Sequence, residues 1–488
     1  MNDLFDCMLH SLQNRSQSSA YLTRRGTMSY GALRNLTAGI LSQIPPQTKQ
    51  PVILFGHKEL YMKAGMLACL FAGAPYVPID RSTPPQRRAA ILAHLRPVLC
   101  VGDLPECACA HLCAEDLERC ARDGAALPLQ VRDRNDDEIA YILFTSGSTG
   151  APKGVQVRYA NIISCVRWLR TLVPDAGSCI LGHARFSFDL SVPELYLSSI
   201  TGATHCVLED DLLRDVPSLF SFLHASSAQT AVLTPSLARF LLADRSFNMS
   251  LMPHLRTMLF CGEALPSATA KMLFDRFPAL RILNCYGPTE CTFAVTAAEI
   301  TRDEAAKPAL PVGIAKPGVH IRITDDQMHP LPDGETGEIV ICGDSVAAGY
   351  LPPASSDAFM HVDGVAAYRT GDRGFLQDKM LWFCGRKDRQ IKLAGYRIEL
   401  SDIESALMCT DGVRDAAVVC TRDIDGNARA LHGFVVCDST TTLPELFAML
   451  KRRLPGYMMP RLHRVSVIPV TENGKRDEAA LLHSGGLI

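Results

Sequence analysis

Short apolar runs that alternate with stretches of helical periodicity constrain the fold of this chain most. Residues 51–55 and 139–144 are runs of this kind, and each has the length of a strand. Continuous apolar runs are typical of strands buried on both faces, and the stretches between them keep a helical period. The alternation therefore predicts α/β layers built around mostly parallel sheets.

The chain is too long for a single ordinary core. At 488 residues it should divide into at least two domains. Residues 311–349 are rich in Gly, Pro and β-branched side chains, which predicts a smaller β-rich subdomain attached to the large N-terminal part. The polar segment 385–389 separates an aromatic run from a strand-like one. We therefore predict an N-terminal domain over residues 1–388 and a C-terminal domain over 389–488.

The C-terminal part has the pattern of a small α+β domain. Ser401 lies three residues before Glu404, a capping-box signature that predicts a helix running to about Met408. Apolar runs of strand length occupy residues 416–420 and 431–437, and residues 443–454 keep apolar side chains at helical spacing. A compact lid on a short polar hinge suits a protein whose domains rotate.

Composition excludes several classes of protein. The chain is 47% hydrophobic, and 49 Lys and Arg residues against 51 Asp and Glu residues leave a net charge of -2. This balance does not favour binding to nucleic acid or to an acidic membrane surface. We see neither a secretory signal nor an apolar run of about 18 residues that could span a membrane. With 18 cysteines and no export signal, we expect a cytoplasmic protein with free thiols. We also expect a monomer, although the sequence by itself leaves the oligomeric state open.

One cluster of thiols could suggest a metal site. Its members are Cys100, Cys107, Cys109, His111, Cys113 and Cys120. Structural zinc sites usually present two separated C-x2-4-C pairs, and the spacings here do not match that pattern. We favour a peripheral stretch that tolerates cysteine, and whether it binds anything stays open at this point.

A loop rich in glycine and hydroxyl groups follows the apolar run 139–144. Its sequence, T-S-G-S-T-G-A-P-K-G at residues 145–154, ends in a lysine followed by a glycine. Glycines let the backbone approach an anion, Ser and Thr add donors, and Lys153 adds positive charge. Flexible surface loops share this composition, so the loop alone is weak evidence. It lacks the Walker A spacing, which disfavours a P-loop kinase or GTPase.

Six further short motifs occur before and after that loop. They are A-G-A-P-Y-V-P-I-D at 72–80, F-D-L-S at 188–191, N-C-Y-G-P-T-E at 284–290, Y-R-T-G-D at 368–372, G-R-K-D-R-Q-I-K at 385–392 and N-G-K at 473–475. Together they resemble the adenylate-forming superfamily of acyl-CoA synthetases, luciferases and amino-acid adenylation domains. Residues 260–263 and 390–400 are most similar to D-alanine–carrier protein ligases and stand-alone amino-acid adenylation enzymes.

The resemblance implies ATP and Mg²⁺ as cofactors and assigns roles to many residues. The residues implied to bind ATP are Thr145, Ser146, Gly147, Ser148, Thr149, Gly150, Asn284, Cys285, Tyr286, Gly287, Pro288, Thr289, Asp372, Phe383, Cys384, Gly385, Arg386 and Lys475. Lys475, Lys153 and Glu290 are the implied catalytic residues, with Glu290 as the Mg²⁺ ligand. Asp372 would accept both ribose hydroxyls, and Asp388 would be the hinge.

The amino-acid side of the site is implied by the same resemblance. The residues implied there are Asp189, Leu190, Cys261, Phe293 and Lys475, and further wall positions are Pro193, Val232, Leu259, Cys285 and Ala294. An α-ammonium group that enters an apolar pocket needs a carboxylate partner, which Asp189 would supply. The alternative is that Asp189 caps a helix beginning near Ser191. The bulk of Phe293 favours glycine or alanine, although Pro193 is smaller than the residue common there.

These patterns predict an amino acid–carrier protein ligase. It would join a small amino acid (glycine, alanine or D-alanine) to AMP, release pyrophosphate, and pass the aminoacyl group to the phosphopantetheine thiol of a separate carrier protein. The sequence has no L-G-G-x-S carrier motif of its own. The alternatives are an acyl- or aryl-CoA synthetase, adenylation of another small apolar amino acid such as proline, and a non-catalytic adenylate-binding protein. The intact Lys153, Glu290, Asp372 and Lys475 disfavour the last.

Overall fold

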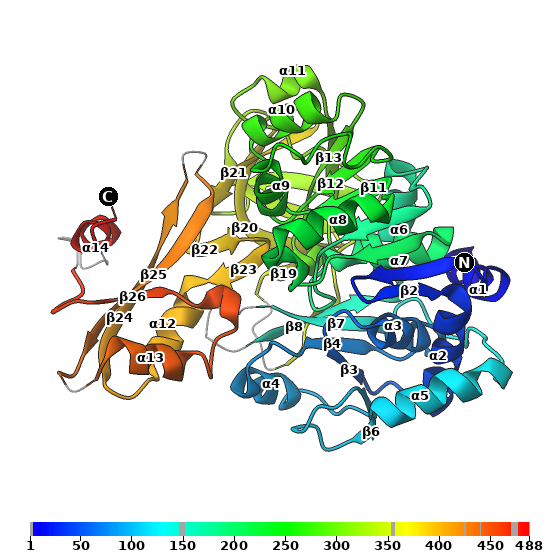
Figure 1. Ribbon diagram of the computed structural model, residues 1–488. Coiled ribbons are helices and arrows are strands. Elements are labelled where there is room, and N and C mark those ends of the chain that lie inside the picture. Colours follow the sequence, from blue (N-terminus) through cyan, green and yellow to red (C-terminus); the bar gives the residue numbers. More distant parts are fainter. Residues whose placement is uncertain are drawn as a thin grey trace. The chain divides into compact units, whose positions relative to one another are not determined.

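The computed structural model describes residues 3–145, 152–352, 357–423, 426–439, 441–469 and 477–487 (Figure 1). Contacts between residues divide the chain into two compact units. The first unit consists of Met1–Asp80, Leu95–Leu143 and Gly154–Lys387. The second consists of Arg81–His94, Phe144–Lys153 and Asp388–Ile488.

The largest sheet has nine strands within the described residues. In spatial order they are β15 (Ile314–Ala315), β14 (Thr296–Ile300), β13 (Arg281–Tyr286), β12 (Thr257–Phe260), β11 (Thr230–Leu233), β9 (Cys179–Gly182), β10 (Thr204–Val207), β1 (Ser19–Thr23) and β2 (Gly26–Ser29). The strands from β13 to β1 run parallel, and β14, β15 and β2 are antiparallel additions at the two edges. The carboxyl ends of the parallel strands therefore meet along one edge, where ligands bind in many α/β folds.

A second sheet has seven strands in the described part of the chain. Their order is β18 (Gly349–Tyr350), β8 (Lys153–Arg158), β7 (Ile139–Thr145), β4 (Tyr76–Asp80), β3 (Val52–Gly56), β5 (Leu99–Val101) and β6 (Ala110–Leu112). β7, β4, β3, β5 and β6 are parallel. The predicted phosphate loop joins β7 to β8, and its residues 146–151 lie outside the described residues.

A smaller antiparallel sheet follows in the chain, as the change of composition near residue 311 predicts. It consists of β16 (Val319–Thr324), β17 (Gly337–Gly343), β20 (Val365–Gln377) and β19 (Phe359–Val362), with β21 (Met380–Arg386) paired to β20. β20 and β21 bring Asp372 opposite Arg386. This register matters for the nucleotide side of the candidate site.

Helices connect and cover the sheets of the first unit (Figure 1). Their bounds are α1 (Asp3–Asn14), α2 (Tyr30–Gln43), α3 (Leu60–Ala72), α5 (Ala114–Asp123), α6 (Tyr159–Leu172), α7 (Ser191–Thr201), α8 (Val216–Ser226), α9 (Pro235–Leu242), α10 (Ser267–Arg276) and α11 (Arg302–Ala305). Short 3-10 turns are η1 (Gly124–Ala126), η2 (Leu212–Arg214) and η3 (Thr289–Cys291). Among the described helices, none is long and apolar enough to cross a membrane.

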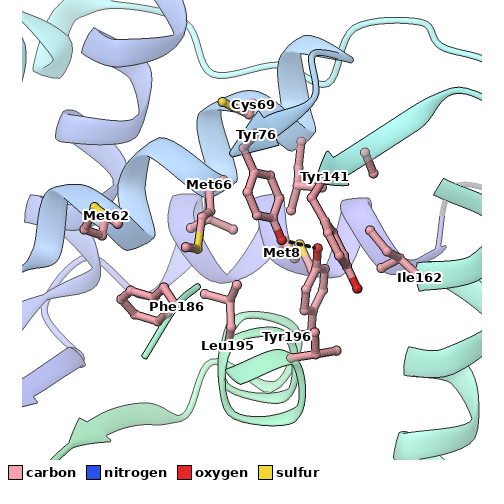
Figure 2. Packing of buried hydrophobic residues seen from close by; sticks show 14 of the residues in the cluster. Met8, Met62, Met66, Cys69, Tyr76, Tyr141, Ile162, Phe186, Leu195 and Tyr196 are labelled. Carbon is pink, nitrogen blue, oxygen red and sulfur yellow. Dashed lines mark hydrogen bonds between the residues drawn. The ribbon is translucent and has the colours of Figure 1, made fainter. Parts of the chain in front are cut away.

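Helices α3 and α7 are buried on all sides. Nearly every residue of both helices is inaccessible to solvent, which is the behaviour of a helix enclosed by other elements. Figure 2 shows Met66 of α3, Tyr76 of β4 and Tyr196 of α7 among the side chains of one buried cluster. The hydroxyls of Tyr76 and Tyr196 lie 3.2 Å apart and share a hydrogen bond. The core of the first unit thus fixes α7, the helix that begins just after Asp189.

The second unit contains mixed α+β structure. Its elements are α4 (Pro85–Leu92), β22 (Gln390–Leu393), β23 (Tyr396–Glu399), α12 (Leu400–Met408), β24 (Val413–Arg422), β25 (Ala428–Cys437), α13 (Leu443–Leu450), η4 (Gly456–Met458), β26 (Arg461–Arg464) and α14 (Glu478–Ser484). β24 and β25 are antiparallel, whereas β26 joins β25 in parallel. Apolar residues of α12 and α13 form one buried cluster with this sheet.

The predicted fold class is confirmed, and two details of the predicted helices are wrong. Ser401 does not cap α12, because the helix already begins at Leu400 and Glu399 holds the N-cap position. The strand β23 ends directly at that helix, so no separate cap is available. The helix predicted over residues 443–454 ends at Leu450, and a turn precedes Pro455. A proline disfavours helical backbone in the residue before it, which shortens the helix.

Candidate active site

Several of the predicted site residues of the first unit lie at the carboxyl edge of the nine-stranded sheet, whereas Asp372 and Arg386 lie on β20 and β21 of the smaller sheet. β9 leads into the segment 183–190 that contains Asp189, and β12 leads directly to Cys261. β13 ends at Tyr286 and is followed by the turn η3, which contains Thr289 and Glu290. Because these strands are parallel and near one another, residues about 100 positions apart in the chain meet here.

The half-buried carboxylate of Asp189 is held by a hydrogen bond. The hydroxyl of Thr289 donates to Asp189 Oδ2 at 2.6 Å. The N-cap residue of α7 is Leu190, so the alternative in which Asp189 serves as the helix cap is wrong. A short bond to an ionised acceptor is one of the stronger hydrogen bonds in proteins and fixes the direction in which the carboxylate points.

The residues predicted to line the side-chain end of the pocket are apolar and buried together. Leu190, Val232, Leu259, Cys261, Cys285, Phe293 and Ala294 belong to one buried cluster. Phe293 is 1% exposed and has a positive φ of 77°, and the preceding Thr292 has a φ of 59°. Such backbone costs about 1–3 kcal/mol per residue and persists only where the surroundings determine it.

Gly287 explains how this strained turn is enforced. A Cβ at that position would lie 2.6 Å from the Cα of Ala294, so a side chain there would collide with backbone. The N–H of Val295 donates to the carbonyl of Tyr286 at 2.8 Å. The two ends of the segment 286–295 are thus pressed together, which directs Phe293 into the apolar cluster.

Glu290 is 1% exposed and is fixed at both its carboxylate and its backbone. The hydroxyl of Tyr350 donates to Glu290 Oε1 at 2.7 Å, and the hydroxyl of Tyr368 lies 3.2 Å from that of Tyr350. The carbonyl of Glu290 accepts the N–H of Ala347 at 2.9 Å. A carboxylate can accept several bonds and is a hard oxygen ligand, so Glu290 fits Mg²⁺.

Asp372 is buried and both of its carboxylate oxygens are already engaged. The hydroxyl of Tyr286 donates to Oδ2 at 2.7 Å, and Arg386 Nη1 donates to Oδ1 at 2.5 Å. Burial and then the charge of Asp372 raise the pKa of Tyr286 well above its usual value, so this phenol stays a donor. A ribose would therefore have to share Asp372 with Tyr286 and Arg386.

The other residues implied to bind nucleotide differ in their exposure to solvent. The amide of Asn284 is 2% exposed and donates to the carbonyl of Pro311 at 2.8 Å, which ties β13 to the segment before β15. The ring of Phe383 lies 6.0 Å from that of Tyr286. Cys384 is exposed, and Gly385 has a φ of 118° that favours glycine.

The remaining predicted residues belong to the second unit. Thr145 ends β7, and its buried hydroxyl has no hydrogen-bond partner among the described residues. Lys153 begins β8. Asp388 is exposed and accepts the N–H of Gln390 at 3.2 Å. Lys475 lies outside the described residues, as do Ser146, Gly147, Ser148, Thr149 and Gly150.

The cysteine cluster at residues 100–120 does not assemble a metal site. Within the described ranges there is no group of three His, Cys, Asp or Glu side chains that could hold a metal ion. The sulfur atoms of Cys107 and Cys109 lie 3.3 Å apart, and His111 bonds to the carbonyl of Cys107 at 2.8 Å. Cys109, His111 and Cys113 lie on or next to the edge strand β6, whereas Cys100, Cys107 and Cys120 are buried.

Sequence reasoning missed several residues that shape the site. Tyr350 orients Glu290 from 60 positions away, and no local pattern announces that contact. Lys58 is buried just after β3, and Arg185 lies within the segment 183–190 that carries Asp189; both contact polar or charged groups. For Lys58, a charged residue next to the apolar strand 52–56 was the available signal, since buried charges need partners.

Comparison with known proteins agrees with this fold. The sequence profile described as AMP-binding enzyme matches residues 10–351, and that of the AMP-binding enzyme C-terminal domain matches residues 402–475. The chain belongs to the AMP-binding enzyme family and is an AMP-forming ligase.

Its relatives include proteins named D-alanine--D-alanyl carrier protein ligase. The one from Bacillus velezensis is 38% identical over 97% of this chain and 98% of its own length. The one from Bacillus anthracis is 36% identical over 95% and 96%, respectively.

Solved structures share the fold over almost the whole chain. The Vibrio cholerae adenylation domain AlmE, in complex with glycyl-adenosine-5'-phosphate, superimposes with a TM-score of 0.85 at 24% identity and covers 100% of this chain and 98% of its own. PA1221, an NRPS protein containing adenylation and PCP domains, gives a TM-score of 0.83 at 26% identity over 99% of this chain and 84% of its own.

Proposed function

We propose that this ligase activates a small amino acid (glycine, alanine or D-alanine) with ATP and transfers it to the phosphopantetheine thiol of a separate carrier protein. The observation that carries the proposal is Asp189, a carboxylate held by Thr289 beside a buried apolar cluster. A carboxylate at that place can neutralise the α-ammonium group of an amino acid, while the apolar walls exclude charged side chains.

The relatives support the carrier-protein step. Proteins named D-alanine--D-alanyl carrier protein ligase are 36–38% identical to this chain over nearly its full length. PA1221 combines adenylation and PCP domains in one protein. The proposal places the reaction in the cytoplasm, where ATP is available, and assigns it to a monomer.

In the first half-reaction a carboxylate oxygen of the amino acid attacks the α-phosphorus of ATP. The new P–O bond forms as the bond to pyrophosphate breaks, and negative charge grows on the phosphoryl oxygens. Lys475 and Lys153 would stabilise that charge, and Asp372 with Arg386 would position the ribose. Glu290 would hold Mg²⁺, which neutralises phosphate charge when bound.

In the second half-reaction the thiolate of the carrier attacks the acyl carbon and AMP leaves. We propose that residues 389–488 act as a mobile lid that turns about Asp388 between the two steps. Lys392 and Gly395 lie in the hairpin of β22 and β23, just beyond that residue, and would replace Lys475 at the site. Domain movements of this kind commonly separate two reactions that share one site.

An acyl- or aryl-CoA synthetase is the competing function. Its substrate has no ammonium group, so a carboxylate at the position of Asp189 would be a liability in the apolar pocket. A ligase for proline or another small apolar amino acid would keep Asp189 and differ only in the pocket walls.

The test is pyrophosphate exchange with the twenty common amino acids, D-alanine and a panel of fatty and aryl acids. We expect exchange with glycine or an alanine enantiomer, and Asp189→Asn should abolish it while the fold is retained. Exchange with fatty or aryl acids alone would overturn the proposal. Transfer is tested separately, with radiolabelled amino acid and a phosphopantetheinylated carrier protein against coenzyme A as acceptor.

A further inference from the structure

A buried lysine joins the two large, mostly parallel sheets of the first unit. Lys58 follows β3 and is 1% exposed. Its ammonium group donates to the carbonyls of His183 and Leu208, each at 2.5 Å. These carbonyls follow β9 and β10, so Lys58 ties the carboxyl ends of two neighbouring strands. The hydroxyl of Tyr21 donates to the carbonyl of Lys58 at 2.8 Å and fixes the backbone there.

Arg185 makes a second connection two residues further along the same segment. Its guanidinium lies 2.7 Å from Asp210 Oδ2 and 3.5 Å from Asp80 Oδ1. His57 Nδ1 lies 2.6 Å from the other oxygen of Asp80. We call these five residues, His57, Lys58, Asp80, Arg185 and Asp210, the charged clamp. It holds the beginning of the segment 183–190 from both sheets.

Consecutive hydrogen-bonded turns connect the backbone of Arg185 to that of Asp189. The N–H of Phe188 donates to the carbonyl of Arg185 at 2.9 Å. The carbonyl of Phe188 then accepts the N–H of Ser191 at 3.1 Å and its hydroxyl at 2.6 Å. The N–H of Val192 donates to the carbonyl of Asp189 at 2.9 Å. Asp189 therefore lies between the clamp and the buried helix α7, with little freedom to move.

The charges of the clamp call for an explanation beyond stability. Asp80 is 4% exposed and the side chain of Arg185 is 15% exposed, whereas that of Asp210 is 38% exposed, so the pair of Arg185 with Asp80 is the one removed from water. Ion pairs removed from water are often no more stabilising than apolar side chains of similar size, because desolvation offsets their attraction. Directional bonds do specify geometry, and a displacement of about 1 Å in a substrate-positioning group can reduce the rate about a hundredfold.

We infer that the charged clamp positions Asp189 to receive the α-ammonium group of the amino acid, with Arg185 as the principal positioning residue. The inference rests on the proposed function. None of the clamp residues needs to touch the substrate. Loss of the clamp should weaken amino-acid binding selectively, because the nucleotide side, built on Asp372 and Arg386, is held by different contacts.

The experiment compares Arg185→Met with Arg185→Lys and with Arg281→Met. Arg281 pairs with Glu299 at 2.7 Å on the exposed surface and serves as the matched control. We measure KM and kcat for the amino acid, KM for ATP, and the melting temperature. Arg185→Met should raise KM for the amino acid about tenfold or more with KM for ATP within about twofold of wild type. Arg185→Lys should recover part of the loss, and Arg281→Met should match wild type.

A rise of both KM values together, or a lower melting temperature with both KM values unchanged, would overturn the inference. If Arg185→Met fails to fold, Asp210→Asn is the milder variant, because it keeps the shape of the side chain and removes its charge. The wild type is assayed first with the full amino-acid panel. If the wild type shows no exchange with any amino acid, the proposed function itself is rejected. If the wild type is active and Arg185→Met leaves KM for the amino acid unchanged, only the positioning role of the charged clamp is rejected.

Discussion

Thr289 connects Asp189, the proposed ammonium-binding residue, with Glu290, the proposed Mg²⁺ ligand. Its hydroxyl donates to Asp189, and the residue that follows it is Glu290. Thr289→Val keeps the shape and removes the donor. A hydrogen bond to a charged group contributes about 1.5–3 kcal/mol, so KM for the amino acid should rise about tenfold or more. Steady-state pyrophosphate exchange measures this, with Thr201→Val as a control in which the lost bond goes to a helix carbonyl. An unchanged KM for the amino acid would show that Thr289 does not orient Asp189.

Phe293 should set the size of the accepted side chain. Phe293→Ala should extend the preference from glycine or alanine to valine or leucine, since the missing ring leaves room for a branched group. Pockets discriminate each methylene by about 1–3 kcal/mol, which gives a shift of roughly tenfold or more in relative kcat/KM. The measurement is a specificity profile over one panel of amino acids. Phe5→Ala, which removes a ring from the same buried cluster at α1, is the control. Coincident profiles for Phe293→Ala and wild type would reject this pocket wall.

The sequence predicts which site residues lie near one another where these residues belong to one contiguous motif. Asn284, Tyr286 and Glu290 lie within one strand and the turn after it, so their grouping follows from local order. The contacts of Tyr350 with Glu290 and of Arg185 with Asp210 join segments that belong to or follow different strands. Such pairs depend on how sheets align, and a single sequence does not contain that register.

At the scale of elements, the clamp links loops that follow β3, β4, β9 and β10, and this predicts a pH-dependent stability. Burial by itself lowers the pKa of His57, but hydrogen bonds to Asp210 and Asp80 outweigh burial and the charge of Lys58, and raise it to about 9 from 6.5. The folded state thus binds the proton more tightly than the unfolded state. The stabilisation is complete below pH 6.5 and is lost as the pH rises through about 9.

The expected loss is on the order of 3 kcal/mol, since each unit of pKa shift corresponds to about 1.4 kcal/mol. Urea unfolding of wild type and His57→Gln across this pH range measures it, and His57→Gln should flatten the dependence. His10→Gln removes an exposed histidine on α1 and should leave the slope as in wild type. A His57→Gln protein that loses as much stability as wild type would assign the titration to another group.

Element boundaries show where local signals fail. The strands predicted at residues 416–420 and 431–437 occur within the longer β24 and β25, because alternation and apolar content decide strands locally. Ser401 misled, because β23 runs directly into α12 and places the N-cap two residues earlier. Tertiary connections override a capping signal of about 1 kcal/mol.

At the scale of the whole molecule, the α/β layers and the change to antiparallel strands could be predicted from the order of apolar runs and from composition. The sequence could not predict that Arg81–His94 and Phe144–Lys153 belong to the second unit, because both are short segments distant in sequence from residues 388–488. The expectation of a moving lid comes from the family resemblance.

Asp388 is predicted to be the hinge between the two half-reactions. Asp388 is exposed and begins the long segment Asp388–Ile488 of the second unit. Proline fixes φ near −65° and restricts the residue before it, so Asp388→Pro should stiffen the junction. If the two half-reactions need different lid positions, a stiff hinge should slow at least one of them by about tenfold or more while both substrates still bind.

Single-turnover adenylation and transfer to the carrier are measured separately for Asp388→Pro. Asp388→Ala is the matched variant, because it removes the carboxylate and keeps the backbone freedom. A defect specific to proline would assign the effect to stiffness, whereas equal defects in both variants would assign it to the carboxylate, which accepts the N–H of Gln390. Wild-type rates for both half-reactions in Asp388→Pro would exclude rotation about this residue, and the exchange of Lys475 for Lys392 at one site would then need another pivot.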